Sequence, residues 1–170
     1  MTAPVIRKAR IADASPILQL INRLALEQIM LPRSPASVLE NIRDFVVAEV
    51  DDRFAGCGAL HVCWSDMAEI RSIAVDPDLQ GHGLGKRMAE VLIAEAEQLG
   101  LPRVFAFTYV PEFFSRLDFH VVEHSSLPHK VFNDCLNCPK YQACDEIAVM
   151  RVLASAAVET LSEFPMPRRP

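Results

Sequence analysis

The spacing of apolar positions predicts a chain in which strands and helices are interleaved. Short apolar runs bounded by turn residues predict strands at 5–9, 45–50, 54–64, 69–75, 103–109, 119–123 and 147–153. Apolar residues with a helical period predict helices from about residue 14, at 36–42, at 86–99 and at 111–117. This pattern predicts one α/β domain over residues 4–153. Residues 154–170 have little to pack against and are expected to form a flexible tail.

A glycine-rich stretch, residues 80–85, separates the predicted strand 69–75 from the predicted helix 86–99. Glycine allows left-handed backbone and close approach to a ligand, and amide groups at a helix start can bind an anion. The same spacing also fits a plain tight turn. A P-loop needs Ser or Thr where Arg87 stands, and a dinucleotide site needs an acidic residue where the next strand ends in Thr108-Tyr109. The pattern therefore favours a phosphate cradle of another kind.

Composition limits the partners. The chain has 170 residues and a net charge of −5, which gives no basic excess for nucleic-acid binding. No run of 18 apolar residues and no export signal is visible, so we expect a cytoplasmic protein without a membrane anchor.

Three of the five cysteines lie close together, at Cys135, Cys138 and Cys144. Their C-x2-C-x5-C spacing is typical of metal ligands, with His129 or His124 as a fourth. Structural zinc sites usually show two paired half-sites, however, and this segment shows only part of a second pair. We therefore expect no metal and favour an ordinary thiol cluster.

Two segments resemble a known family. Residues 73–85 are similar to the acetyl-CoA signature of the GNAT superfamily of N-acetyltransferases, Q/R-x-x-G-x-G/A, with Gln80, Gly83 and Gly85 at the fixed positions. Residues 113–119 are similar to the family's F-Y-x-x-x-G-F segment, with Phe114 in place of Tyr and Asp118 in place of Gly. Further segments resemble the short amino-acid N-acetyltransferases of the N-acetylglutamate synthase type, namely 30–34, 41–45, 56–61, 68–72 and 127–131.

This resemblance implies a single N-acetyltransferase domain over most of 4–153. Its sheet is expected to be mixed and mostly antiparallel, flanked by helices and splayed between strands 4 and 5. The implied reaction is acetyl transfer from acetyl-CoA to the α-amino group of glutamate, the entry step of arginine biosynthesis. The implied acetyl-CoA residues are Ile73, Ala74, Val75, Gln80, Gly81, His82, Gly83, Leu84, Gly85 and Lys86.

Acetylation of an amine also needs proton transfers. Glu69, on the fourth strand, is the best candidate for the general base, directly or through water. It could equally be a structural carboxylate paired with Arg71. The family's usual acid is the Tyr that Phe114 replaces, so Tyr109 and Ser115 are the substitutes near in sequence. A CoA thiolate leaves readily because free thiols titrate at about 8.5.

A dicarboxylic acceptor needs cations, and Arg suits a carboxylate because it donates two parallel hydrogen bonds. Arg71 lies two residues from Glu69 and so on the same face of the strand. Arg33 and Arg43 fall in the loop and helix that cover the acceptor side of this fold, though each could be a solvated surface charge. Lys130 is a further candidate, supported by the resemblance.

Two other functions stay open. The acceptor could be a polyamine, a drug amine or a protein N-terminus, but these would favour an acidic groove. Alternatively, Phe114 could mark a CoA-binding regulatory module that has lost turnover. An exposed edge strand at 147–153 would also make a homodimer plausible.

Overall fold

The computed structural model describes residues 3–127, 138, 140 and 143–153. The expected tail at 154–170 lies outside the described residues, as do Lys130, Cys135 and His129.

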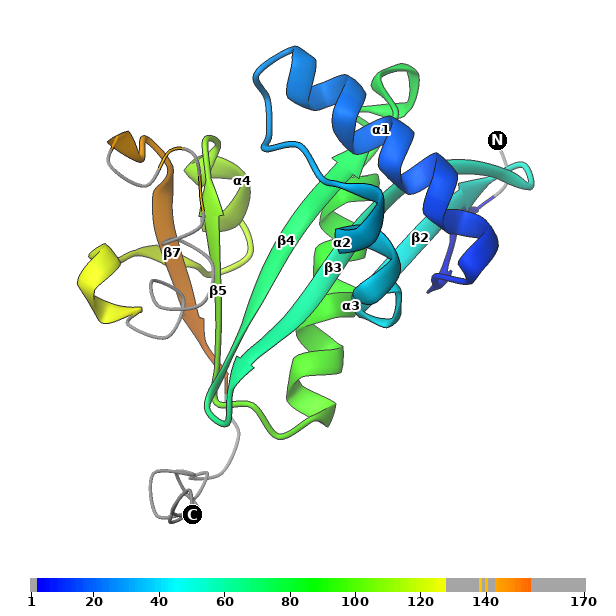
Figure 1. The fold of residues 1–170 in the computed structure, drawn as a ribbon. Helices are drawn as coiled ribbons and strands as arrows, with labels where there is room; N and C mark the ends of the chain where they lie inside the picture. The colour runs from blue at the N-terminus through cyan, green and yellow to red at the C-terminus, as the bar shows by residue number, and fades with distance from the viewer. Residues whose placement is uncertain (1–2, 128–137, 139, 141–142, 154–170) are drawn as a thin grey trace, which may run out of the picture.

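A seven-stranded sheet forms the centre of the domain (Figure 1), with the order β1-β2-β3-β4-β5-β7-β6. The strands are β1 (Val5–Lys8), β2 (Phe45–Val50), β3 (Arg53–Trp64), β4 (Met67–Val75), β5 (Arg103–Thr108), β6 (His120–Val121) and β7 (Ile147–Val152). Every neighbouring pair is antiparallel except β4 and β5, which are parallel. This confirms the mixed, mostly antiparallel sheet.

The strands β4 and β5 are paired over only a short distance. Ala68 lies beside Val104 and Glu69 beside Phe105, and beyond these pairs the two strands separate, as Figure 1 shows. The predicted splay between strands 4 and 5 is therefore confirmed. It opens a space between two strands whose backbone groups are no longer paired with each other.

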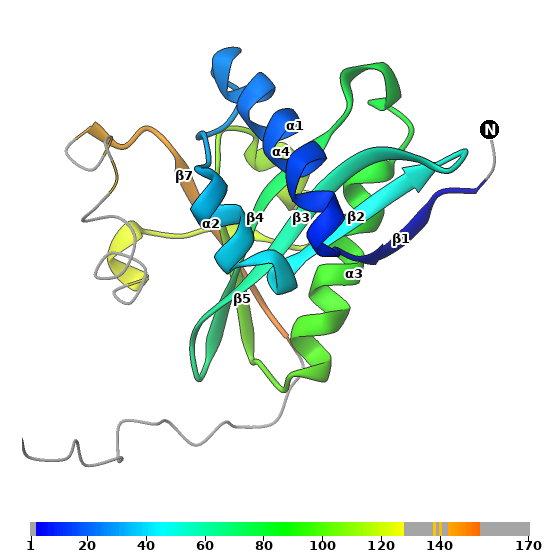
Figure 2. The ribbon, with the colours of Figure 1, turned by 45° about the vertical axis from the view of Figure 1, so that its right-hand side comes forward.

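Helices cover both faces of the sheet (Figure 2). The α-helices are α1 (Ala14–Leu26), α2 (Pro35–Glu40), α3 (Leu84–Gln98) and α4 (Pro111–Ser115). Short 3-10 turns occur at η1 (Ile11–Asp13), η2 (Ile42–Asp44), η3 (Pro77–Leu79) and η4 (His124–Ser126). One apolar core packs α3 against the sheet, and a second packs α1 and α2 against its other face. These two cores hold β4 in place from both sides.

Two expectations need correction. The helix α3 begins at Leu84, two residues before its expected start, so Leu84 and Gly85 belong to its first turn. The segment 147–153 is not the edge strand either, because β6 pairs with it through His120–Met150 and Val121–Val149. The strand at 119–123 was itself predicted, but the pattern along a single segment does not show which other strand it pairs with.

Candidate functional site

The glycine-rich loop enters α3 through left-handed backbone. Gly81 has φ +80° and Gly83, the N-cap of α3, has φ +77°. A Cβ at either position would meet nothing within 4 Å, so conformation and not crowding favours glycine here. The amide groups of the first turn have no carbonyl four residues earlier within the helix. The loop therefore presents backbone donors and the positive end of the helix to the same space.

Side chains of the loop stabilise its shape. Gln80 Nε2 donates to the carbonyl oxygen of Val75 (3.1 Å), which ties the loop to the end of β4. His82 Nδ1 lies 2.9 Å from the carbonyl oxygen of Gln80. Of these two residues expected to bind acetyl-CoA, Gln80 lines the cavity described below, and its side chain is bonded to β4, whereas the His82 side chain contacts the loop's own backbone.

A β-bulge interrupts β4 at its border with Ile73, Ala74 and Val75, the residues of this strand that are expected to bind acetyl-CoA. Cys57 pairs with Ala74 and Ala59 with Arg71, so Ser72 and Ile73 together lie opposite Gly58. Ser72 has φ +57°, which is unusual for a non-glycine residue. Bulges re-aim the backbone and the side chains beside them. The sequence analysis missed this bulge because Ser72 carries no turn signal of its own.

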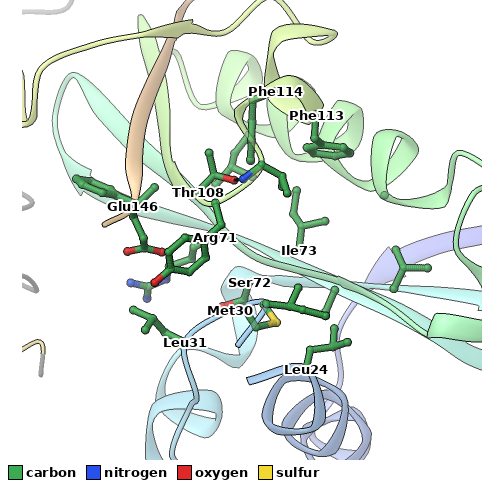
Figure 3. Close-up of a pocket in the computed structure, with 18 of the residues that line it drawn as sticks. Leu24, Met30, Leu31, Arg71, Ser72, Ile73, Thr108, Phe113, Phe114 and Glu146 are labelled. Atoms are coloured by element: carbon green, nitrogen blue, oxygen red, sulfur yellow. Dashed lines mark hydrogen bonds between the residues drawn. The ribbon is translucent and has the colours of Figure 1, made fainter. Parts of the chain in front are cut away.

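A cavity of about 910 Å3 opens between the separated strands. It extends from the glycine-rich loop, past Ile73 and Phe113, to Arg71 and Glu146 (Figure 3). Its walls come from β4, the start of α3, the end of β5, α4, the segment between α1 and α2, and the segment before β7. The space is large enough for a long, narrow ligand together with a small second one.

Two oppositely charged side chains, one buried and one nearly so, face this cavity from β4. Arg71 Nη1 lies 3.7 Å from Glu69 Oε2, and their side chains are only 11% and 5% exposed. The expected shared face is therefore observed, as is the pairing of Glu69 with Arg71. A carboxylate and a guanidinium held together out of water can each bind a group of opposite charge.

The remaining candidate cations differ in position. Arg33 lines the cavity, and its Nε donates to Ser72 Oγ at the bulge (3.3 Å). Arg43 is exposed in η2 and is not among the residues that line the cavity.

Tyr109 lies at the end of β5 and lines the cavity. Its hydroxyl donates to Asp145 Oδ1 (3.0 Å) and accepts from Lys140 Nζ (2.8 Å). Burial raises the pKa of Tyr109 above its usual 10.0, and the Lys140 ammonium partly offsets this shift. The phenol therefore keeps its proton at neutral pH. Lys140 and Asp145 were not singled out from the sequence, because nothing in the chain indicates that they return to β5.

The two residues of α4 that bear on acid catalysis lie in different surroundings. Ser115 is exposed, donates to the Glu112 carbonyl oxygen (2.9 Å) and does not line the cavity. Phe114 is buried, with its ring packed edge-on against Phe113 and Phe119.

The cysteines form no metal centre within the described part of the chain. Cys138 and Cys144 both line the cavity, but the described residues contain no group of three His, Cys, Asp or Glu residues suited to a metal. His124 Nε2 lies instead 3.0 Å from the Glu146 carbonyl oxygen. Cys57 is fully buried, and burial raises the pKa of its thiol to about 12. Within the described residues, no helix is long and apolar enough to cross a membrane.

Comparisons with known proteins agree with this geometry. Residues 17–120 match the acetyltransferase (GNAT) family. The chain is 40% identical over 87% of its length to an uncharacterized N-acetyltransferase of Chlorobaculum tepidum, covering 96% of that protein. It is 41% identical over 77% of its length to an amino-acid acetyltransferase of Mycobacterium tuberculosis, covering 76% of that protein. Longer relatives exist: the chain spans only 29% of the amino-acid acetyltransferase of Neisseria meningitidis, at 34% identity over 72% of this chain.

Solved structures that superpose on this chain include two in complex with CoA. A Mycobacterium tuberculosis protein in complex with CoA and the ligand NLQ superposes with a TM-score of 0.77 at 33% identity, over 88% of this chain and 99% of that one. The N-acetylglutamate synthase of Neisseria gonorrhoeae, complexed with coenzyme A and N-acetyl-glutamate, superposes with a TM-score of 0.81 at 28% identity. That match covers 90% of this chain and 36% of the synthase.

Proposed function

Because the chain belongs to the acetyltransferase (GNAT) family, we propose that it transfers the acetyl group of acetyl-CoA to the α-amino group of glutamate. The similarity to amino-acid acetyltransferases and to a structure holding CoA and N-acetyl-glutamate supports this acceptor. The product would then be N-acetylglutamate, which enters arginine biosynthesis.

The observation that carries the proposal is the buried Glu69–Arg71 pair at the cavity. An α-amino acid carries a carboxylate and an ammonium on one carbon, which matches two neighbouring opposite charges. Arg71 can bind the carboxylate while Glu69 accepts a hydrogen bond from the ammonium. The incoming carboxylate competes with Glu69 for Arg71, so binding itself makes Glu69 available as a base.

The proposed chemistry follows from these positions. Glu69 removes one proton from the ammonium, and the neutral amine attacks the thioester carbon. A backbone N–H beside the bulge, at Ile73 or Ala74, donates to the carbonyl oxygen as it becomes negative. The carbon–sulfur bond then breaks and the nitrogen gives up its second proton to water, leaving the amide and a CoA thiolate. The Tyr109 phenol supplies the proton to sulfur, and solvent restores it.

The second carboxylate of glutamate needs another cation. Arg33 reaches the cavity from the segment between α1 and α2 and bonds Ser72, the residue that follows Arg71 in β4. We assign it to the side-chain carboxylate. Lys130 remains a further candidate, and Arg43 is the weaker one because it is exposed outside the cavity.

The test is thiol release from acetyl-CoA with a panel of acceptors: glutamate, glutamine, a neutral amino acid, spermidine and a peptide with a free N-terminus. We expect the highest kcat/KM for glutamate and a product whose mass is that of N-acetylglutamate. A preference for spermidine or the peptide would overturn the amino-acid acceptor. CoA binding without thiol release for any amine would favour the regulatory module instead.

A further inference from the structure

Asn22, on the inner part of α1, is hydrogen-bonded to the backbone of a residue in the cavity wall. Its Nδ2 donates to the carbonyl oxygen of Arg33 (3.0 Å), and its Oδ1 accepts from the amide of the same residue (2.9 Å). A primary amide thereby offers Arg33 the donor and acceptor that a neighbouring strand would offer. Both bonds are made to backbone atoms, so they fix the chain at residue 33 independently of its side chain.

The next residue is fixed as well. Ser34 is the N-cap of α2, and its Oγ accepts from the amide of Ser37 (3.1 Å). Arg33 is therefore held between a bond to α1 and the start of α2. From this anchored position its Nε donates to Ser72 Oγ at the bulge of β4. The guanidinium thus reaches the cavity from a backbone that has little freedom to move.

The position of Asn22 on α1 argues for a specific role. It follows Ile21, which is fully buried, and it is itself only partly exposed at the border of the helix's apolar face. Asn is a poor helix former compared with Ala or Leu, either of which would suit this border. The helix tolerates Asn at a site where its amide contacts the segment between α1 and α2.

We infer that Asn22 is a positioning residue for the acceptor site, acting through Arg33. The inference rests on the proposed function, in which Arg33 binds the acceptor's second carboxylate. A guanidinium fork binds a carboxylate well only in one orientation, so a loosened anchor should weaken acceptor binding. The bonds of Asn22 described here go to Arg33 and not to the glycine-rich loop. The affinity for acetyl-CoA should therefore not change.

The experiment compares Asn22→Ala, which removes both bonds, with Asn22→Asp, which keeps only the acceptor. For Asn22→Ala we expect the KM of glutamate to rise about 10-fold, from the loss of two ordinary hydrogen bonds, with kcat and the KM of acetyl-CoA within about 2-fold. Asn22→Asp loses the donor and its carboxylate repels the Arg33 carbonyl oxygen, so the KM of glutamate should rise at least 10-fold here too. Gln19→Ala is the matched control on α1, since Gln19 is exposed and its amide donates to Ser15 Oγ in the same helix. Its KM values should equal those of the parent.

A double-variant cycle separates positioning from general stability. In an Arg33→Ala background, Asn22→Ala should raise the KM of glutamate no further, because Arg33 is the only route of its effect. Independent, multiplying effects in the two backgrounds would overturn the inference, as would equal loss of acetyl-CoA affinity in a folded Asn22→Ala protein. If Asn22→Ala does not fold, the same cycle with Asn22→Asp decides the question. Should the parent prefer another amine, the cycle is measured with that amine, and the choice of glutamate fails separately.

Discussion

The two ends of the cavity are built in different ways. The end at the glycine-rich loop consists of backbone: left-handed glycines at 81 and 83, amides in the first turn of α3, and the bulge at Ser72. The far end consists of side chains from separate segments, with Glu69 and Arg71 from β4, Arg33 from before α2 and Tyr109 from directly after β5. Backbone donors suit a part of the ligand that never changes. Side chains suit recognition of the acceptor, because related enzymes can differ in their acceptors and side chains change with the sequence.

Among substitutions that separate the two ends of the cavity, Glu69→Gln should have the largest effect. We expect kcat to fall by about 10²–10⁴-fold, as for loss of a general base, while the Kd of CoA stays within about 2-fold of the parent value. Isothermal titration with CoA and initial rates with glutamate measure the two quantities. Glu112→Gln, an exposed carboxylate on α4, is the control and should keep full activity. A folded Glu69→Gln enzyme with parental kcat would exclude Glu69 as the base.

Arg71→Gln should change binding more than turnover. Loss of a charged hydrogen bond in a desolvated site costs about 2 kcal/mol, so the KM of glutamate should rise about 30-fold. The Kd of CoA should stay nearly the same because the glycine-rich loop is untouched. Steady-state kinetics against both substrates measures this split. An unchanged KM for glutamate would mean that Arg71 serves only to pair with Glu69.

At the other end, Gly83→Val should weaken CoA binding about 10-fold, because a β-branched residue resists φ +77° and its side chain projects from the loop. Glutamate KM at saturating acetyl-CoA should be close to parental. Gly100→Val provides the matched control: Gly100 has φ +76° but lies at the opposite end of α3. If the two variants bind CoA equally well, the loop is not the phosphate cradle.

The smallest expected effect is at Asp118, where the family resemblance predicts Gly. Asp118 has φ +61° in the turn that follows α4, with Phe119 N donating to Phe114 O (3.2 Å), the geometry that glycine usually adopts after a helix. Asp118→Gly should therefore stabilise the fold by about 0.5–1 kcal/mol and leave both KM values unchanged. Urea unfolding followed by circular dichroism measures the change. A less stable variant would show that the Asp118 side chain contributes more than its backbone strain costs.

The sequence allowed much of the backbone-built end to be predicted. The glycine-rich loop is contiguous, so its glycines, the strand before it and the helix after it are all visible in residues 69–99. The splay of the sheet was also predicted correctly, although only through the family resemblance. The bulge at Ser72 was missed, since it depends on pairing with β3 and not on a local turn residue.

The side-chain end was predicted only where residues are close in sequence. Glu69 and Arg71 share a face because strands alternate, and this could be inferred directly. The contacts of Tyr109 with Lys140 and Asp145, and of Asn22 with Arg33, join residues that no periodicity relates. Such contacts depend on how whole elements pack, so a single sequence gives no signal for them.

Glycine at position 56 ties the chemistry to a residue outside the cavity. A Cβ there would lie 2.6 Å from the Ala74 carbonyl oxygen, so β4 could not keep its place beside β3, whereas Met88 Cε, 3.1 Å away, belongs to a flexible side chain that can give way. The strand that would have to move is the one that bears the bulge and the Glu69–Arg71 pair. A single added methyl group on β3 would thus press on the strand that carries the proposed catalytic pair, from a position that is not among the residues lining the cavity.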